Sequence, residues 1–501
     1  MYYFPHIENK SRRSFLMKSL SAAVGLSVAP DVWGKGYESV ATSNIGSLRG
    51  ALPNILVILV DDLGYGDLKN YGCPEGETPY FDKFFREGLK FTSFYSNGAF
   101  CAPTRASLLT GLYPQHAGIW RAPSSPVKSK TKKRDRDQET IEIESLNERG
   151  FPDDIELLPR LLKNEGYKTA MFGKWHLGYE SPNIPNDRGF DHFMGFLQGS
   201  SPYGPNHKTL RLNREPYEEK GHLTEIFTQH AIDYIEKHNM DERFFMYLSY
   251  NAPHGPIENG VSMHSDIVKK YKERGIGEKR ANYLALIDHL DQNIERVMTA
   301  LETKGIDENT IVFLLSDNGG QLNYLGRNLP LRGGKGQVFE GGIRVPCAVR
   351  WPGMINGGTV TDTRTATMDL FPTILEIAGA SVPEQNADQQ VSGISLVDHL
   401  TLEGRSTLPD RYLFFEHLGM VGAIHGTWKI VADIYGKRET DPKVTNVTMP
   451  KVFELYNLDQ DIGETINLAK RHPEIVRGME NELVKWMRSY KRTQFTNEWK
   501  L

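Results

Sequence analysis

The segment Ile55-Leu56-Val57-Ile58-Leu59-Val60 is an unbroken apolar run that ends directly in Asp61-Asp62. Strands with this composition are buried on both faces, as in a parallel sheet that is covered by helices. Three further segments have the same character, namely residues 169–172, 244–250 and 311–315. We interpret the four runs as inner strands of one sheet.

Helical patterns separate these runs. Apolar residues recur at three-to-four spacing in residues 80–87, 155–164, 223–237, 280–303 and 369–378. Strands that alternate with helices predict the α/β class. We therefore expect a large, doubly wound mixed sheet flanked by helices, in a domain that spans residues 50–380.

The pattern changes after about residue 380. Residues 381–390 are polar, and the segments 412–416, 423–425 and 427–432 alternate like exposed-edge strands. A last helical pattern covers residues 473–490. Residues 381–501 are therefore predicted to form a smaller C-terminal α+β subdomain, with an antiparallel sheet and one helix.

The N-terminus resembles a targeting segment. Ser11-Arg12-Arg13-Ser14-Phe15-Leu16 precedes a weakly apolar run at residues 20–28. That run is well short of the ~20 apolar residues of a membrane-spanning helix. Paired arginines followed by Phe and Leu resemble a twin-arginine signal, so residues 1–35 are predicted to direct export to the periplasm or the extracellular space. No later segment is long and apolar enough to predict a membrane span.

Composition excludes several classes of partner and site. The chain has 501 residues and a formal net charge of -4, which gives no reason to expect binding to nucleic acid or to an anionic membrane surface. Its only cysteines are Cys73, Cys101 and Cys347. Three cysteines predict neither a disulfide framework nor a thiolate zinc site.

Polar residues follow each of the four apolar runs. The successive endings are Asp61-Asp62, Lys174-Trp175-His176, Asn251-Ala252-Pro253-His254 and Ser316-Asp317-Asn318-Gly319. In open α/β sheets, ligands bind in the crevice at the carboxyl ends of the strands. One polar ending is usually a turn or a helix cap, but four together favour a shared cleft.

Asp61, Asp62, Asp317 and Asn318 carry hard oxygen ligands. Three carboxylates in one cleft would repel one another unless a cation lay among them, and oxygen ligands favour calcium or magnesium over zinc. The simpler interpretation is that one of the paired aspartates caps a helix and that Asp317-Asn318 forms a turn. Residue types alone leave both interpretations open.

Cationic and proton-transferring side chains complete the candidate cleft. Lys174 and Lys335 can bind an oxyanion, and His176 and His254 can transfer protons near neutral pH. Any one of these histidines could equally be an ordinary core or surface residue. The same holds for the segment from Cys101 to Arg105, which suits either a buried cysteine at a helix start or a reactive thiolate beside an arginine.

Cys101-Ala102-Pro103-Thr104-Arg105, followed by Ala106-Ser107-Leu108-Leu109-Thr110-Gly111, resembles the signature of the type I, formylglycine-dependent sulfatases of the alkaline phosphatase superfamily. Other segments resemble further blocks of that family in order and spacing. They are Asp61-Asp62-Leu63-Gly64, Gly173 to Gly178, Ala252-Pro253-His254, Ser316 to Gly319, Arg332 to Lys335, Glu340 to Pro346 and Glu454 to Leu458.

The resemblance implies a specific chemistry. A separate maturation enzyme would oxidise Cys101 to formylglycine, and the aldehyde would hydrate to a geminal diol. One hydroxyl, bound to Ca²⁺, would attack the sulfur of a sulfate ester and release the alcohol. The second hydroxyl would then lose its proton, so that the C–O bond breaks, sulfate leaves and the aldehyde returns.

The resemblance also implies roles for individual residues. The metal ligands would be Asp61, Asp62, Cys101 in its converted form, Asp317 and Asn318. Arg105 and Lys174 would steady the developing charge, and His176 would be the base for sulfate release. His254 and Lys335 would bind sulfate and protonate the leaving oxygen. A further hydroxyl, from Ser200 or Ser201, is left unassigned.

Alternatives remain at this point. A phosphodiesterase or phosphonate hydrolase of the same superfamily could share the motif, and an inactive glycan-binding relative is a third possibility. A sulfated carbohydrate is the substrate class that the resemblance favours, without naming the sugar or the sulfate position. The basic loop at residues 123–147 has two interpretations: its cations bind neighbouring anionic groups of a glycan, or the loop is a solvated surface insertion.

Overall fold

Strand β1 (Asn54–Asp61) contains the first apolar run and lies at the centre of the large sheet. The computed structural model describes residues 52–123, 150–257, 262, 264–383, 390–433 and 453–490. All of them belong to one compact unit, Arg49–Leu501. Every residue of β1 is buried, as expected of a strand that is covered on both faces.

The large sheet has ten strands in the order β11-β2-β10-β9-β1-β8-β4-β5-β6-β7. Its centre is parallel and consists of β9 (Thr310–Ser316), β1, β8 (Arg243–Pro253), β4 (Tyr167–Lys174) and β5 (His192–Phe196). Both sides continue with antiparallel pairs, through β10 (Cys347–Arg350) and β2 (Leu89–Phe91) on one side, and β6 (Asn206–Leu212) and β7 (Glu215–Lys220) on the other. The edge strand β11 (Thr359–Thr361) pairs in parallel with β2. The predicted mixed α/β sheet is confirmed.

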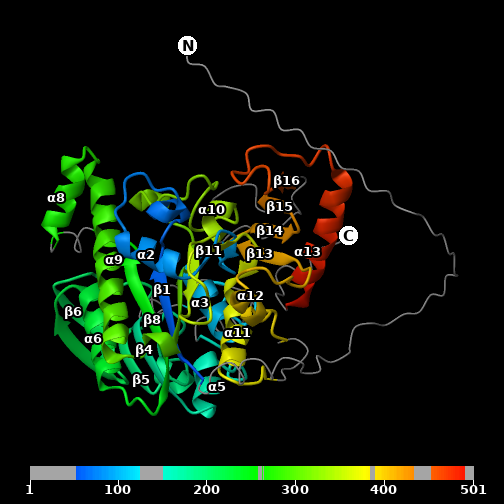
Figure 1. Ribbon diagram of the computed structural model, residues 1–501. Helices are drawn as coiled ribbons and strands as arrows, with labels where there is room; N and C mark the ends of the chain where they lie inside the picture. Colours follow the sequence, from blue (N-terminus) through cyan, green and yellow to red (C-terminus); the bar gives the residue numbers. More distant parts are fainter. Residues whose placement is uncertain are drawn as a thin grey trace, which may run out of the picture. The chain divides into compact units, whose positions relative to one another are not determined.

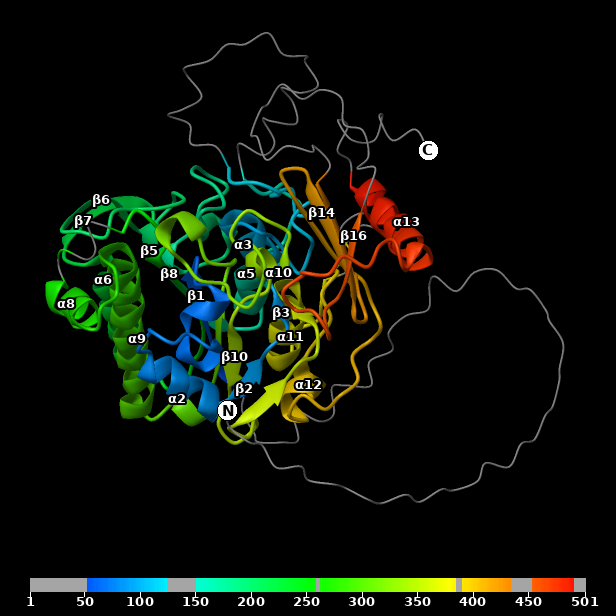
Figure 2. The ribbon, with the colours of Figure 1, turned by 90° about the horizontal axis from the view of Figure 1, so that it is seen from above.

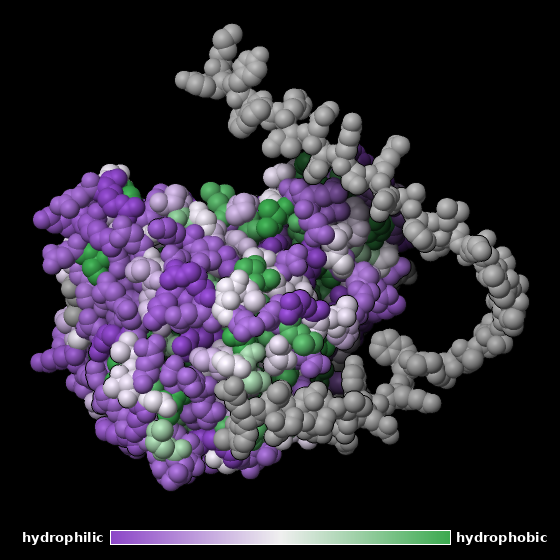
Figure 3. Space-filling view, in the orientation of Figure 1, coloured by the Kyte–Doolittle hydropathy of each residue, from purple (hydrophilic) through white to green (hydrophobic). Residues whose placement is uncertain are grey.

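Helices cover both faces of the sheet (Figures 1 and 2). One layer contains α2 (Pro79–Glu87), α6 (Leu223–Lys237) and α9 (Glu278–Lys304), with α8 (Ser265–Glu273) packed on α9. The other layer contains α3 (Cys101–Thr110), α5 (Leu158–Asn164), α11 (Leu370–Ile377) and α12 (Val397–Thr401). In the space-filling view (Figure 3), the surface over α8 and α9 is mainly hydrophilic, as expected of the outer side of a covering layer.

The period of two along β1 sends alternate side chains into the two layers. Leu56, Ile58 and Val60 form one core with residues of α6 and α9 that recur at helical spacing, including Phe227 and Leu290. Burial of each such side chain stabilises the folded state by about 1.5–3 kcal/mol relative to leaving that side chain exposed. This packing fixes the position of β1 along its own axis, and so fixes the position of its carboxyl end at the edge of the sheet.

A separate four-stranded antiparallel sheet follows toward the C-terminus. It consists of β13 (Leu413–His417), β14 (Met420–His425), β15 (Trp428–Asp433) and β16 (Glu454–Asn457), in that order. Helix α13 (Pro473–Ser489) packs against β14 and β15. The predicted α+β arrangement is confirmed, but the expectation of exposed-edge strands is wrong for β14 and β15, because both are inner strands with buried centres.

The two sheets share apolar contacts. The core of the C-terminal sheet includes Tyr95 and Ile343 from the preceding part of the chain. Tyr95 belongs to the short strand β3 (Phe94–Tyr95), which pairs with β12 (Thr365–Ala366), and Ile343 ends the short helix α10 (Glu340–Ile343). The boundary at residue 380 stays a prediction.

Some expectations fall on parts of the chain that the structure does not describe. The predicted signal at residues 1–35 lies outside the described residues, and so does the basic loop apart from Pro123. Within the described residues, no helix combines the length and the apolar character that crossing a membrane would require. The same residues include all three cysteines, which are buried and unpaired.

Helix α2 begins against a carboxylate from α9. The Asp291 side chain accepts hydrogen bonds from the backbone nitrogens of Tyr80 at 3.0 Å and Phe81 at 2.6 Å, while Thr78, the N-cap residue of α2, gives no side-chain cap. We expect Asp291→Ala to lower the free energy of unfolding by about 1–3 kcal/mol, since two N–H groups lose their acceptor. Urea unfolding measures this loss. Asp233→Ala, on the outer side of α6, is the control and should change it by less than about 0.5 kcal/mol.

Candidate active site

The carboxyl ends of β4, β8, β1 and β9, which are neighbours in the sheet, bring the predicted residues to one edge. Val60 of β1 pairs with Ser316 of β9, and the backbone nitrogen of Asp317 donates to the Val60 carbonyl at 3.0 Å. Asp61 pairs with Pro253, the last residue of β8. Sheet register therefore sets the aspartates that follow β1 and β9 side by side.

Arg105 lies among fully buried charges. Its Nη2 is 2.7 Å and its Nε 3.1 Å from Oδ2 of Asp317, and its Nη1 donates to the backbone oxygen of Lys174 at 3.0 Å. The Lys174 Nζ is 2.6 Å from Oδ2 of Asp61. All four side chains have no exposed surface. Charges can be buried in this way only when each has a partner.

A second group of charges surrounds Asp62. The Lys335 Nζ lies 2.7 Å from Oδ1 and 2.8 Å from Oδ2 of Asp62, and the Asn318 amide donates to Oδ1 at 2.8 Å. The His254 Nε2 is 3.7 Å from Oδ2. Asp62 has a φ of 66°, which is uncommon for a residue other than glycine and occurs where surrounding contacts hold it.

Cys101 is the first residue of α3 and is 1% exposed. Its Sγ lies 3.3 Å from Nδ1 of His176, which follows β4 and has a φ of 61°. The side chains of Asp61, Cys101 and Asp317 each offer an atom within 4.8 Å of the others. The start of a helix carries a partial positive charge, so Cys101 faces the carboxylates from a favourable position for an oxyanion.

The pKa values of the carboxyl groups depend on burial first and on neighbours second. Burial raises the pKa of Asp61 and Asp62, but the neighbouring basic groups together outweigh it, so both values are lowered; the largest such effects come from Lys174 on Asp61 and from Lys335 on Asp62. Burial and repulsion from Asp61 raise the pKa of Asp317. Three crowded carboxylates of unequal pKa are the arrangement expected of a group that holds a cation.

The two histidines of the site are held neutral. Burial, Lys174 and Arg105 put the pKa of His176 well below its usual range. Burial also lowers the pKa of His254, although Asp61 and Asp62 act in the opposite direction. A neutral imidazole can accept a proton, so His176 beside position 101 has the protonation state of a general base.

Two buried oxygen atoms of this charged group have no hydrogen-bond partner among the described residues. They are Oδ1 of Asp61 and Oδ1 of Asn318. An unpaired buried oxygen is costly, and a hard cation would satisfy both atoms at once. The oxygen-rich donor set therefore fits calcium. The helix-cap and turn interpretation explains neither atom.

The predicted site residues form one connected group in the structure. The group contains Asp61, Asp62, Cys101, Arg105, Lys174, His176, His254, Asp317, Asn318 and Lys335. Ser201, which the sequence left unassigned, is buried and pairs through its hydroxyl with Thr209 at 3.1 Å.

Two further residues contact this group and a third lies next to it; all three were missed at the sequence level. The Ser249 hydroxyl, on β8, hydrogen-bonds Arg105 and donates to the Lys174 carbonyl at 2.8 Å. A Cβ on Gly199 would come within 2.7 Å of Nε2 of His176, so any other residue there would force the imidazole ring to shift. His417 of β13 stacks on Phe100, which precedes Cys101, with ring centroids 5.2 Å apart.

A family model described as Sulfatase matches residues 53–380. The chain belongs to the sulfatase family. A second model, described as N-sulphoglucosamine sulphohydrolase, C-terminal, matches residues 334–489 of the sulfatase. Human N-acetylgalactosamine-6-sulfatase is 34% identical to it over 383 residues, which cover 72% of this chain and 68% of the relative. The sulfatase is thus a sulfuric ester hydrolase.

A solved structure and a further relative agree with this assignment. The sulfatase is similar to the crystal structure of Ps i-CgsB in complex with k-i-k-neocarrahexaose, with a TM-score of 0.75 and 26% identity, over 88% of this chain and 94% of that one. A sulfatase of Formosa agariphila is 29% identical over 504 residues, covering 87% of this chain and 88% of the relative. The expected family and fold are confirmed.

Proposed function

We propose that this sulfatase hydrolyses sulfate monoesters on a carbohydrate, with formylglycine made from Cys101 as the nucleophile and Ca²⁺ as the metal cofactor. The observation that carries the proposal is the position of Cys101, within reach of Asp61, Asp317 and the neutral His176. Two similar proteins support the substrate class, because one is named N-acetylgalactosamine-6-sulfatase and the other was crystallised in complex with k-i-k-neocarrahexaose.

The charge balance of the site supports an anionic substrate. Three carboxylates, of Asp61, Asp62 and Asp317, face the permanent cations Arg105, Lys174 and Lys335. These charges cancel, so a bound Ca²⁺ would leave the site with two positive charges. A sulfate ester carries one negative charge and would enter this field favourably.

Each residue then has a role that its position permits. Asp61, Asp62, Asp317 and Asn318 would hold the cation, whose Lewis acidity makes an oxygen nucleophile available at neutral pH. Arg105 and Lys174 compensate charge at position 101. His176 takes a proton from that side chain so that sulfate can leave. His254 and Lys335, on the Asp62 side, bind the sulfate oxygens. The negative charge of the bound ester favours the protonated form of His254, which then supplies a proton to the leaving alcohol.

Mass spectrometry of the peptide that contains residue 101 tests the nucleophile. Since Cys101 is 1% exposed in the folded chain, the maturation enzyme should be present during synthesis. We expect formylglycine at position 101 in the active protein. Full activity with an unmodified Cys101 would refute the proposal.

Substrate assays test the reaction class separately. We expect faster turnover of 4-nitrophenyl sulfate than of a 4-nitrophenyl phosphate diester, and desulfation of at least one sulfated oligosaccharide in a panel with mapped products. Preference for the diester would favour the phosphodiesterase alternative. If protein that carries formylglycine turned over none of these substrates, the alternative of an inactive glycan-binding relative would be favoured.

Removal of the cation should abolish most activity. We expect EGTA to lower the turnover of 4-nitrophenyl sulfate by about 100-fold or more, because the carboxylate group then lacks its Lewis acid. Added Ca²⁺ should restore it. Equal activity in EGTA and in Ca²⁺, measured on metal-depleted protein, would contradict a calcium enzyme.

A further inference from the structure

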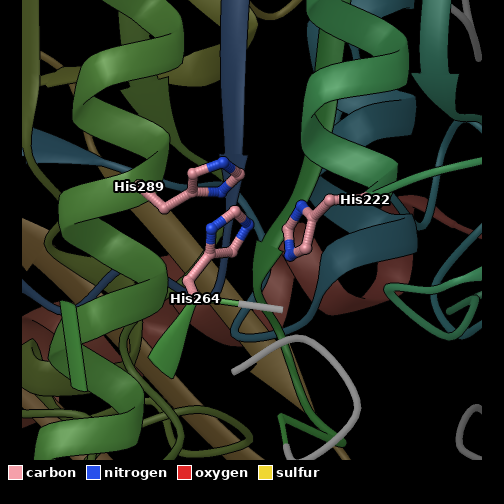
Figure 4. A group of neighbouring side chains, drawn as sticks. All are labelled: His222, His264 and His289. Atoms are coloured by element: carbon pink, nitrogen blue, oxygen red, sulfur yellow. The ribbon is translucent and has the colours of Figure 1, made fainter. Parts of the chain in front are cut away.

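Three histidines outside the active site point toward one another (Figure 4). His222 precedes α6, His264 precedes α8, and His289 lies within α9. Each offers a nitrogen atom within 4.8 Å of the others. The ring centroid of His222 is 4.7 Å from that of His264 and 4.4 Å from that of His289. The rings of His264 and His289 are stacked, with centroids 3.8 Å apart. None of the three belongs to the catalytic group.

One nitrogen of each ring is buried without a hydrogen-bond partner in the described part of the chain. These atoms are Nε2 of His222, Nε2 of His264 and Nδ1 of His289. His222 is 0% and His289 4% exposed. Buried polar atoms are normally satisfied, so three orphaned nitrogens in one place indicate a missing partner.

Glu225 orients one of the rings. Its Oε1 lies 3.0 Å from Nε2 of His289 and 3.7 Å from Nε2 of His264. The Asn293 amide nitrogen lies 3.1 Å from the same Nε2 but also donates to the His289 backbone oxygen at 2.8 Å. The carboxylate at Nε2 favours the proton on that nitrogen, which leaves the lone pair on the orphaned Nδ1 of His289. A carboxylate behind a histidine is the usual outer support of a metal-binding imidazole.

All three imidazoles are held in the neutral form that binds metals. Burial lowers the pKa of His222 to about 2 and that of His289 to about 4, and it also lowers the pKa of His264. Their lone pairs are therefore free of protons at neutral pH.

We propose that His222, His264 and His289 bind a transition-metal ion, with zinc as the best fit, that cross-links α6, α8 and α9. Imidazole ligands suit Zn²⁺, Cu²⁺ or Ni²⁺, whereas Ca²⁺ requires oxygen ligands. Three histidines leave a fourth position for water. The stacked rings of His264 and His289 must separate slightly to direct their nitrogens at one point. Nδ1 of His222 accepts a hydrogen bond from the Thr224 backbone nitrogen at 3.3 Å, so metal binding through Nε2 requires the ring proton to move to Nδ1 and this long contact to break.

Cobalt titration of the full-length chain tests the site. The protein carries no polyhistidine tag and is kept in saturating Ca²⁺, which occupies the oxygen-ligand site. We expect one Co²⁺ per chain with the visible absorption of low-coordinate nitrogen ligation, displaced by one Zn²⁺. Cys101→Ala should bind equally, which excludes the Cys101 thiol as a ligand.

Variants separate a metal site from simple packing of histidines. We expect His264→Gln to abolish the cobalt band, and Glu225→Gln, at a partly exposed position, to weaken Zn²⁺ binding by about 10–100-fold. His192→Gln, a half-buried histidine on β5, is the matched control and should bind as the unmodified chain does. Zn²⁺ should raise the melting temperature of the unmodified chain but not of His264→Gln. Absence of Co²⁺ and Zn²⁺ binding, or equal binding in His264→Gln, would overturn the proposal.

Discussion

Cys101→Ala is expected to lower the turnover of 4-nitrophenyl sulfate by about 10⁴-fold or more, because the proposed nucleophile derives from this side chain alone. Cys101 begins α3, and all ten residues of that helix are buried, so the helix is anchored by packing rather than by the thiol. Alanine also suits the first turn of a helix. The variant should therefore keep its fold. A melting temperature close to that of the unmodified chain would verify this.

A second buried cysteine provides the control for Cys101→Ala. Cys347 lies on β10, is 0% exposed and is unpaired, so it resembles Cys101 in burial but lies outside the charged group. Cys347→Ala should retain turnover within about threefold, since its loss removes only packing. Similar turnover of the Cys101→Ala protein and the unmodified enzyme would rule out position 101 as the source of the nucleophile.

The chemistry of the proposed site depends on charges that are buried together. Arg105 and Asp317 have no exposed surface, and the same is true of Lys174 and Asp61. Without solvent, each charge acts on its neighbours with little screening. A substrate oxyanion would meet donors that are already oriented, which is the main way in which such sites lower an activation barrier.

The central fold could be predicted because its signal is local. The apolar runs of β1, β4, β8 and β9 are continuous, so each strand is visible without knowledge of its partners. The strands β6 and β7 lack that signal, since their residues are mostly polar and partly exposed. The strands β2 and β11 have only three residues each, too few to show a period.

The candidate site was predictable where its residues directly follow strands. Asp61, His254 and Asp317 are of this kind, since the topology of a parallel sheet brings strand ends together. Ser249 could not be found in this way, because it lies within β8 and looks like an ordinary strand residue. The three clustered histidines were missed for another reason: they are far apart in sequence, and only the packing of three helices brings them together.

The largest effect on stability is expected in the C-terminal sheet, at a buried group of charges. Lys429 of β15 has no exposed surface, and its Nζ lies 2.8 Å from Oε1 of Glu340 and 2.9 Å from Oε1 of Glu464. Glu340 has other donors, from Tyr95 at 2.9 Å and Arg344 at 3.3 Å. In the described part of the chain, the Glu464 carboxylate has one other donor, the backbone nitrogen of Glu340 at 2.7 Å. Glu464 therefore depends most on the lysine.

Lys429→Met should lower the free energy of unfolding by about 3–5 kcal/mol, because it leaves the carboxylate of Glu464 buried without a counter-charge. Burial already raises the pKa of Glu464, and loss of Lys429 should raise it further. A carboxyl group with a raised pKa keeps its proton to a higher pH in the folded state than in the unfolded state. The stability of the variant should therefore be greatest below the unfolded pKa of glutamate and fall as pH rises through the folded pKa. Urea unfolding at several pH values measures this trend.

The double variant Lys429→Met/Glu464→Gln tests the cause of that loss. Removal of the stranded charge should recover part of the stability and remove most of the pH dependence, because the neutral amide does not titrate and costs less to bury. Lys485→Met is the control, since that lysine is 70% exposed on α13 and pairs only with Glu482 in the described contacts. Lys485→Met should change the free energy of unfolding by less than about 0.5 kcal/mol. Equal losses for the single and double variants would show that lost packing of the lysine stem, and not the unpaired carboxylate, destabilises the sheet.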